Sequence, residues 1–197
     1  MKNNGKQIRP ADIGKRRKYG DVDIEAIVTT ALEIIGRKGA LKLTMRSLAE
    51  ELGISTMATY HYVPSKEVLI DMVMDRIYSQ ISFVNIPGSP EEKIRGLFWQ
   101  ILDAEKKYPG LALIAPLDRQ GAESLRVRAE FDQVFKDAGC DDDIRNAGYV
   151  LFILFLHGVA RVESGRNLAI SQIPEIKKAF NNSLTLIGTG LQGFARK

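Results

Sequence analysis

The sequence predicts an all-α fold, with a small N-terminal helical domain followed by a larger helical domain. Apolar residues recur at the three- and four-residue spacing of a helix face from residue 24 to residue 194. No segment shows the alternation of polar and apolar residues that is typical of a half-buried strand. Near the N-terminus, two short helical segments flank a glycine, which is the pattern of a helix-turn-helix.

The first helix is expected to begin after Asp21 or Asp23, because either carboxylate can accept hydrogen bonds from the first turn. It should end at Gly39, since Arg37 and Lys38 place positive charge at the negative end of the helix dipole. Its inward face is expected to consist of the apolar residues at helical spacing, which are Ile24, Ile27, Val28, Ala31, Leu32 and Ile35.

The helix-turn-helix is expected over residues 44–62. Thr44 can cap its first helix, and Gly53 can end that helix by adopting a left-handed conformation that costs other residues about 1–2 kcal/mol. Ser55 then caps a second helix over residues 56–62. The apolar residues that the first of these helices buries are Leu48, Ala49 and Leu52.

The second of these helices has a surface suited to DNA. Its side chains form neither an apolar stripe nor a charged, solvated face, and they include hydroxyl groups, a methionine and aromatic rings. Such groups contact phosphates and base edges when a helix enters the major groove. We expect DNA contacts from Ser55, Thr56, Met57, Tyr60, His61 and from Arg46 and Lys66, the last two fixing the register on the phosphate backbone.

The first 20 residues form a basic arm. They hold seven lysines and arginines and one aspartate, a net charge of +6, whereas the whole chain carries +4. Several glycines and a proline make it a poor helix former, and a flexible cationic segment can neutralise phosphates or enter the minor groove. Arg16 and Arg17 are therefore further DNA-contact candidates, and a merely solvated tail is the alternative.

A fourth helix should follow Ser65 and continue to Ile81, long enough to connect the two domains. We place the domain boundary inside it, which gives a flexible arm over residues 1–20, a helix-turn-helix domain over 21–68 and a second helical domain over 69–197. Ser89, Pro90 and Glu92 form an almost complete helix start for the next helix, which runs to about Lys107.

Beyond it, a short apolar segment spans residues 111–117 and another helix ends at Gly139. The helix over about residues 143–164 is apolar almost all round in its first half, so it must be covered on two sides. The final helix offers a matching stripe, and the two together predict a four-helix interface in a homodimer. That stripe contains Ile173, Ile176, Phe180, Leu184, Ile187, Leu191 and Phe194.

Aromatic residues on the predicted helices of the second domain form either its core or the wall of a small-molecule pocket, and both alternatives stay open. His157 follows a strongly apolar run, so it is a satisfied buried polar group or a ligand contact. An apolar wall with few polar groups implies a hydrophobic effector. The candidate ligand-binding residues are Phe98, Trp99, Phe131, Phe135, Phe152, Phe155 and His157.

The motifs of catalysis are missing from the sequence. The two histidines are isolated, with no partner at metal-ligand spacing, and no phosphate loop or nucleophile elbow is present. We therefore expect no enzyme, no cofactor and no metal. Cys140 lies among aspartates that disfavour a thiolate, so it should be inert. Without a signal-peptide segment or an apolar run of about 20 residues, no membrane contact and a cytoplasmic location are expected.

About 50 contiguous residues resemble the tetracycline-repressor (TetR) family of bacterial transcription regulators. One departure is Thr59, at a position where the family usually has a leucine that packs into the domain. Sparser features of the second domain resemble the tetracycline-repressor type: Tyr108 to Leu111, Ala138-Gly139, Gly148-Tyr149 and Gly158. The N-terminal resemblance consists of Ile24 to Val28, Ala31-Leu32, Gly39, Leu43-Thr44, Arg46, Leu48-Ala49, Leu52 to Ser55, Tyr60, Val63, Ser65-Lys66 and Leu69.

The resemblance implies a homodimeric repressor that binds a pseudo-palindromic double-stranded DNA operator and leaves it when a small molecule binds. Two alternatives from other classes remain. One is a DNA-binding regulator or architectural protein with no ligand, and the other is a small helical enzyme. A thermal-shift screen without any stabilising small molecule would favour the first, and failure to bind any operator would favour the second.

Overall fold

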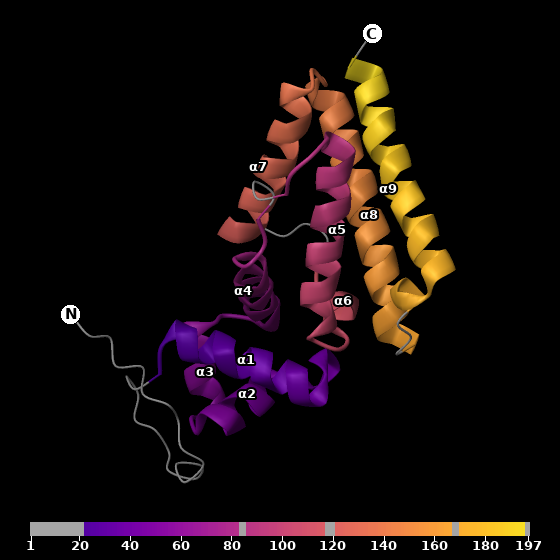
Figure 1. The fold of residues 1–197 in the computed structure, drawn as a ribbon. Helices are drawn as coiled ribbons and strands as arrows, with labels where there is room; N and C mark the ends of the chain where they lie inside the picture. Colours follow the sequence, from indigo (N-terminus) through magenta and orange to yellow (C-terminus); the bar gives the residue numbers. More distant parts are fainter. Residues whose placement is uncertain (1–21, 83–85, 117–120, 167–169, 196–197) are drawn as a thin grey trace, which may run out of the picture.

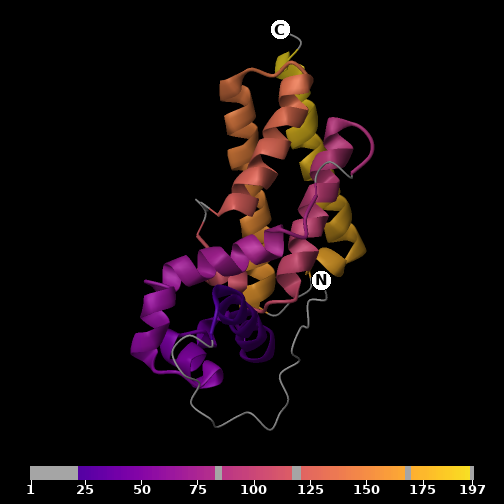
Figure 2. The same ribbon diagram turned by 90° about the vertical axis from the view of Figure 1, so that its left-hand side faces the viewer.

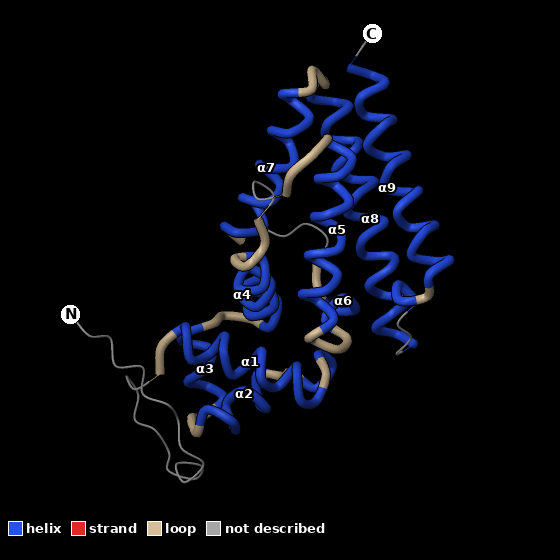
Figure 3. Tube along the Cα trace, viewed as in Figure 1, coloured by secondary structure: helices blue, strands red, loops and turns tan. Residues whose placement is uncertain are grey.

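The computed structural model describes residues 22–82, 86–116, 121–166 and 170–195, and every regular element within these ranges is a helix (Figures 1, 2 and 3). The predicted all-α fold is confirmed. A small domain made by α1 to α3 lies below a taller bundle of α5 to α9, with α4 between them (Figure 1). The elements are α1 Ile24–Lys38, η2 Ala40–Lys42, α2 Met45–Leu52, α3 Thr56–Tyr62, α4 Lys66–Tyr78, α5 Pro90–Lys106, α6 Leu111–Ile114, α7 Ala122–Asp137, α8 Asp142–Arg166, η3 Ile170–Gln172 and α9 Pro174–Ala195.

Local capping sets the bounds of the N-terminal helices. Asp23 caps α1 through a bond from the Ala26 amide (2.7 Å), which settles the choice left open between the two aspartates. Thr44 caps α2 and forms a capping box with Ser47, and Gly53 ends α2 at φ 70° and ψ 28°. These bounds agree with those predicted. On α1 the predicted inward face is buried except at Ile24, which is exposed in the first turn, and Leu32, which is half-buried.

The fourth helix is shorter than predicted. It begins at Lys66 after the Ser65 cap but ends at Tyr78, so Ile81 lies in the segment that follows the helix and is nevertheless buried. The apolar spacing continues beyond the helix because Ile81 packs into the same core. Both faces of α4 are buried, since it contacts α1 on one side and α5 and α7 on the other.

The bundle places α8 in contact with α5, α6, α7 and α9. Its start at α5 has the predicted capping box, in which Ser89 and Glu92 cap each other's backbone amides. Gly148 permits the close packing of α8 on α9, because a Cβ atom there would lie 2.4 Å from a methyl group of Leu191. A Cβ atom at Gly188 would likewise lie 3.0 Å from the Cα atom of Glu91 on α5.

By length and composition, residues 142–164 of α8 form one helix that could cross a membrane. The same property is found in core helices, and 39% of its most apolar 18-residue window is buried in the protein. The contacts of α8 with four neighbouring helices explain the apolar character of its inner face. Its outer face is treated below with the proposed dimer.

The apolar stripe of α9 faces its own bundle rather than a partner. Leu184 and Leu191 are buried there, and Phe180 and Ile187 pack against the same core. Leu186, which is absent from the predicted stripe, is 74% exposed. Ile173 precedes the helix and is exposed, while the placement of the Phe194 side chain lies outside the described residues.

Gly53→Ala should destabilise the protein by about 1–2 kcal/mol, because alanine is strained in the left-handed conformation that ends α2. Urea unfolding followed by circular dichroism measures the loss. Gly36→Ala is the matched control: this exposed glycine lies within α1, its new Cβ atom would meet nothing closer than 4.0 Å, and alanine there should stabilise the helix by about 0.5–1 kcal/mol. Equal effects of the two substitutions would contradict this account of the turn.

Candidate functional site

The helix α3 is held firmly on the N-terminal domain. Ser55 caps it through the Ala58 amide at 3.1 Å, and Val63 ends it as a fully buried residue. Thr59 is also fully buried, and its hydroxyl donates to the Thr56 carbonyl at 2.6 Å. The hydroxyl is therefore satisfied within the helix, so a threonine can occupy the position where a leucine is usual without leaving a buried donor unpaired.

The opposite face of α3 is open to solvent and bears the predicted contact residues. Met57 is 71% exposed and Tyr60 is 45% exposed, and His61 is exposed beside them. Thr56 and Lys66 are half-buried at the two ends of the same segment. Large apolar side chains left outside the core mark this face as a surface for another molecule rather than as part of the fold.

Charged residues of α2 adjoin this face. Arg46 is largely exposed and pairs with Glu50 at 2.9 Å, a surface ion pair of small net stability that a phosphate can replace. On the other side of α2, Glu51 accepts from Lys38 at 2.8 Å and pairs with Arg37 at 3.2 Å. The hydrogen bond from Lys38 chiefly lowers the pKa of Glu51, opposed by a small desolvation, so the carboxylate stays ionised and ties α2 to α1.

Two of the predicted DNA-contact residues, Arg16 and Arg17, lie outside the described residues. The remaining seven belong to one continuous region that runs from α2 through α3 to the first residue of α4. Their contacts with DNA remain a prediction, supported by the exposure of the face that they share.

The predicted ligand-binding aromatics of the bundle come together in space. Phe98 of α5 lies 5.3 Å from Phe155 and 6.5 Å from Phe152, both of α8, between ring centroids. Phe131 of α7 lies 5.5 Å from Phe152 and 5.0 Å from Phe135. Four of these rings are under 2% exposed: Phe98, Phe131, Phe135 and Phe152. They pack as a core in this structure, so a ligand must separate some of them.

Trp99 and His157 flank this cluster. Trp99 donates from Nε1 to Asn181 of α9 at 2.9 Å, and the ammonium of Lys177 lies 5.0 Å from the centre of its ring. His157 is buried, and its Nδ1 atom lies 2.9 Å from the Ile153 carbonyl, one turn earlier in α8. This contact makes His157 a satisfied polar group, one of the two possibilities that the sequence left open.

Cys140 is buried, and its sulfur contacts the Leu191 carbonyl at 3.2 Å. Burial chiefly raises the pKa of its thiol, so the thiolate is disfavoured at neutral pH; the neighbouring aspartate, the cause expected from the sequence, adds only a smaller effect. Within the part of the chain that the structure describes, no group of three potential metal ligands is found.

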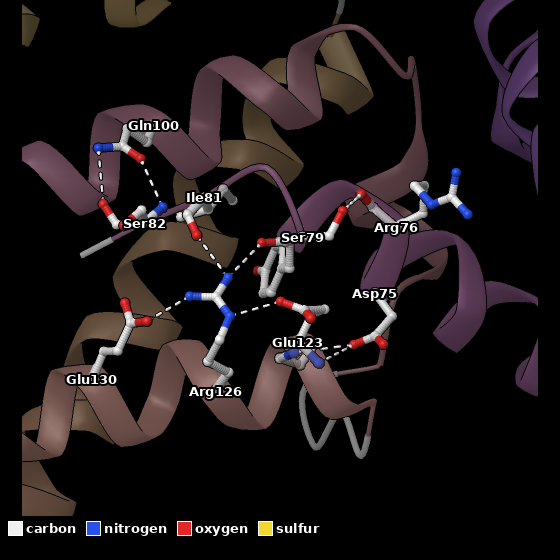
Figure 4. A network of polar contacts seen from close by, with 11 residues as sticks. Asp75, Arg76, Ser79, Ile81, Ser82, Gln100, Glu123, Arg126 and Glu130 are labelled. Atoms are coloured by element: carbon white, nitrogen blue, oxygen red, sulfur yellow. Dashed lines mark hydrogen bonds and ion pairs between the residues drawn. The ribbon is translucent and has the colours of Figure 1, made fainter. Parts of the chain in front are cut away.

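Sequence reasoning missed a polar network between α4 and α7 (Figure 4). It includes Asp75 of α4, and Arg126 and Glu123 of α7. No local signal marks these residues, because the groups that they join lie 45 to 48 positions apart in the chain. Gly121, just before α7, is the one position where a small residue hinted at a close approach.

Comparisons with known proteins agree with this geometry. Residues 27–73 match the family model described as bacterial regulatory proteins, tetR family. The HTH-type transcriptional repressor DrrR1 of Streptomyces coeruleorubidus is 38% identical over 69 residues, which cover 34% of this chain and 26% of the relative. The nucleoid occlusion factor SlmA of Mannheimia succiniciproducens is 32% identical over 106 residues, 49% of each chain. The chain thus spans a quarter to a half of the length of these relatives.

Solved structures match the fold over nearly the whole length. ActR of Streptomyces coelicolor, in complex with actinorhodin, superposes with a TM-score of 0.75 and 22% identity over 89% of this chain and 99% of that one. BioQ with its double-stranded DNA operator superposes with a TM-score of 0.73 and 22% identity over 87% and 99%.

The fold and the exposed helix define the class, a helix-turn-helix domain joined to a helical bundle. The match over the helix-turn-helix makes the particular assignment: the chain belongs to the TetR family of bacterial regulatory proteins.

Proposed function

We propose that this chain is a DNA-binding transcriptional regulator, a cytoplasmic repressor that a small-molecule effector releases from its operator. The observation that carries the proposal is the outward face of α3, where Met57 and Tyr60 are exposed on a helix whose inward residues are fully buried. A rigid helix with large exposed side chains suits insertion into the major groove. The operator complex of BioQ and the repressor DrrR1 support the same function for this fold and this domain.

The proposed division of labour follows the domain boundary predicted within α4. Residues 21–68 read DNA, and residues 69–197 bind the effector and dimerise. A regulator of this kind needs no catalytic group, cofactor or metal, and we propose that the chain is not an enzyme.

Tyr60→Ala should weaken operator binding by about 1–3 kcal/mol, roughly 5- to 150-fold, because a base or phosphate contact is lost from an exposed ring. The affinity is measured by fluorescence anisotropy on a duplex selected from a random library with the parent protein. Leu41→Ala is the control, since this residue is also an exposed apolar side chain of the same domain but lies in η2. Equal affinities of Tyr60→Ala and the parent would remove Tyr60 from the site.

The proposed dimer uses the outer faces of α8 and α9. The exposed apolar residues gather there: Val150, Leu151, Leu154, Val162 and Leu186. A groove between the two helices adjoins them, lined by Leu151 and Leu186 together with Gly190, whose added Cβ atom would meet no atom within 4 Å. Apolar surface on two adjacent helices fits a two-fold, four-helix interface.

Leu186→Glu should dissociate the dimer, because it places an unpaired charge in an apolar interface without touching the core of the protomer. The loss of several kcal/mol that such a charge costs shifts the dissociation constant by more than a hundredfold. Sedimentation equilibrium measures it, and Leu125→Glu on α7 is the exposed control. Leu184→Glu is unsuitable, since Leu184 is fully buried in its own protomer. A full-strength dimer of Leu186→Glu would place the interface elsewhere.

The proposed effector site lies among the rings of α5, α7 and α8. The complexes of ActR with actinorhodin and of TetR from Acinetobacter baumannii with minocycline show that related bundles hold polycyclic molecules. We propose a hydrophobic, aromatic effector for this chain. Trp99 adjoins Phe98 at 5.2 Å between ring centroids, so its fluorescence should report an occupied site.

Phe98→Ala should weaken the effector by about tenfold or more, since one wall of the proposed site is removed. Aromatic compounds found by thermal shift are titrated against Trp99 emission and against the operator complex. Leu48→Ala in α2 is the control, because it removes a fully buried side chain from the other domain. A compound that releases the operator without changing Trp99 emission, and with equal affinity for Phe98→Ala, would move the site.

A second candidate function is a DNA-binding protein with no ligand. The observation that favours it is the close packing of the bundle aromatics, four of which are under 2% exposed. The partial likeness to the nucleoid occlusion factor SlmA is compatible with such a role. Operator binding that no aromatic compound changes would favour this candidate over the first.

A further inference from the structure

The helix α4 and the helix α7 cap each other at the boundary between the two domains. The N-cap position of α7 is Gly121, which has no side chain to satisfy the first amides of the helix. Asp75 of α4 takes that role, because its Oδ1 atom accepts from the amides of Glu123 at 2.7 Å and Ser124 at 3.1 Å (Figure 4). A carboxylate at this place also meets the positive end of the α7 dipole.

The return contact comes from Arg126 of α7. Its Nη2 atom donates to the carbonyls of Tyr78 at 3.1 Å and Ile81 at 2.7 Å, which belong to the end of α4 and the segment after it. The guanidinium is held in place by Glu123 at 2.7 Å and Glu130 at 2.6 Å (Figure 4). Positive charge is thus fixed at the negative end of α4. We call this pair of contacts, Asp75 with α7 and Arg126 with α4, the α4–α7 latch.

Gly121 is required by the latch rather than by its own backbone. Its φ of −65° and ψ of 149° suit any residue. A Cβ atom there would lie 2.3 Å from Oδ1 and 2.7 Å from Cγ of Asp75, so alanine would push the carboxylate away from the α7 amides. The substitution therefore opens the latch without removing either charged group.

The latch is connected to the rest of the N-terminal domain. Arg76, next to Asp75, forms a bidentate pair with Glu25 of α1. A second contact between the domains joins the amide of Ala40 to the carbonyl of Pro109 at 2.7 Å, near the C-terminal end of α1 (Figure 1). Because this second contact is made by backbone atoms alone, it persists through side-chain substitution, and the N-terminal domain can turn about it when the latch opens.

We propose that Asp75 and Arg126 are positioning residues for DNA reading, which set the angle of α4 against α7 and hence the place of α3. The inference rests on the proposed function for its effect on DNA, but its structural part stands independently. With the latch open, α3 samples several positions and only a fraction of molecules fits the operator. The apparent affinity then falls by that fraction.

The position of α3 is measured by pulsed electron spin resonance between nitroxides at Met57→Cys in α3 and Lys136→Cys in α7, in a Cys140→Ala background diluted with unlabelled protein. Both sites are exposed. A single narrow distance is expected with the latch intact. Asp75→Ala, Arg126→Gln and Gly121→Ala should each broaden or shift the distribution, and Asp75→Ala combined with Arg126→Gln should add little, since the two residues act as one unit.

Operator affinity is measured on the same variants without labels, on the duplex selected by the parent. Each latch variant should bind about tenfold more weakly, with an unchanged slope of log affinity against log salt, because no phosphate contact is lost. Arg128→Gln is the matched control: it removes the same charge from an exposed position of α7 whose contacts are with Asn146 and Tyr149 of α8. It should keep the parental distance and affinity.

The outcomes separate the two proposals. Folded latch variants that keep the narrow distance, or that keep the parental affinity while the distance broadens, overturn the latch. A parent protein that selects no duplex overturns the proposed function instead, and the distance distribution then decides the structural part. Circular dichroism confirms that the variants are folded, and Gly121→Ala keeps both charged residues, so agreement of all three variants excludes a general loss of stability.

Discussion

The helix α4 has to be buried by two domains at once, and the arrangement of the whole chain depends on this constraint. Six of its 13 residues are buried, and they are distributed over faces that contact α1 on one side and α5 and α7 on the other. Burial of apolar surface has no direction, so it holds α4 between the domains without fixing its angle. Hydrogen bonds are directional, and the bonds from Asp75 and Arg126 supply the orientation that apolar packing leaves open.

The sequence predicted the helix-turn-helix to the residue because every signal needed there is local. Thr44, Gly53 and Ser55 act on amides or carbonyls within five positions of themselves, and each gives the same boundary in the structure. The end of α4 was predicted wrongly for the opposite reason. The apolar spacing reaches Ile81, but the helix stops at Tyr78, where carbonyls are satisfied by an arginine 48 positions away. No pattern within a helix contains that contact.

Periodicity also indicates that a face is apolar without indicating its partner. The stripe of α9 was predicted to meet a second subunit, yet Leu184 and Leu191 are buried in their own bundle, and the exposed leucine is Leu186. The aromatic residues present the same ambiguity. A core and a pocket wall both require apolar side chains on the inner face of a helix, so the sequence left both alternatives open, and in the structure the rings lie in mutual contact.

The rings and the latch meet on one helix. Phe131 and Phe135 of α7 belong to the aromatic cluster, and Arg126 lies five residues earlier, about 7.5 Å along the axis at 1.5 Å per residue. A molecule that entered between Phe131 and Phe152 would have to displace α7 or α8, because a close-packed interior cannot absorb the added volume. A shift of α7 by about 1 Å would lengthen the 2.7 Å bond from Arg126 to Ile81 beyond hydrogen-bonding distance. The backbone contact of Ala40 with Pro109 lies on α6's side of the boundary and does not involve α7. Movement of α7 would therefore act on one of the two domain contacts and not on the other, which converts a displacement of the helix into a rotation of the N-terminal domain.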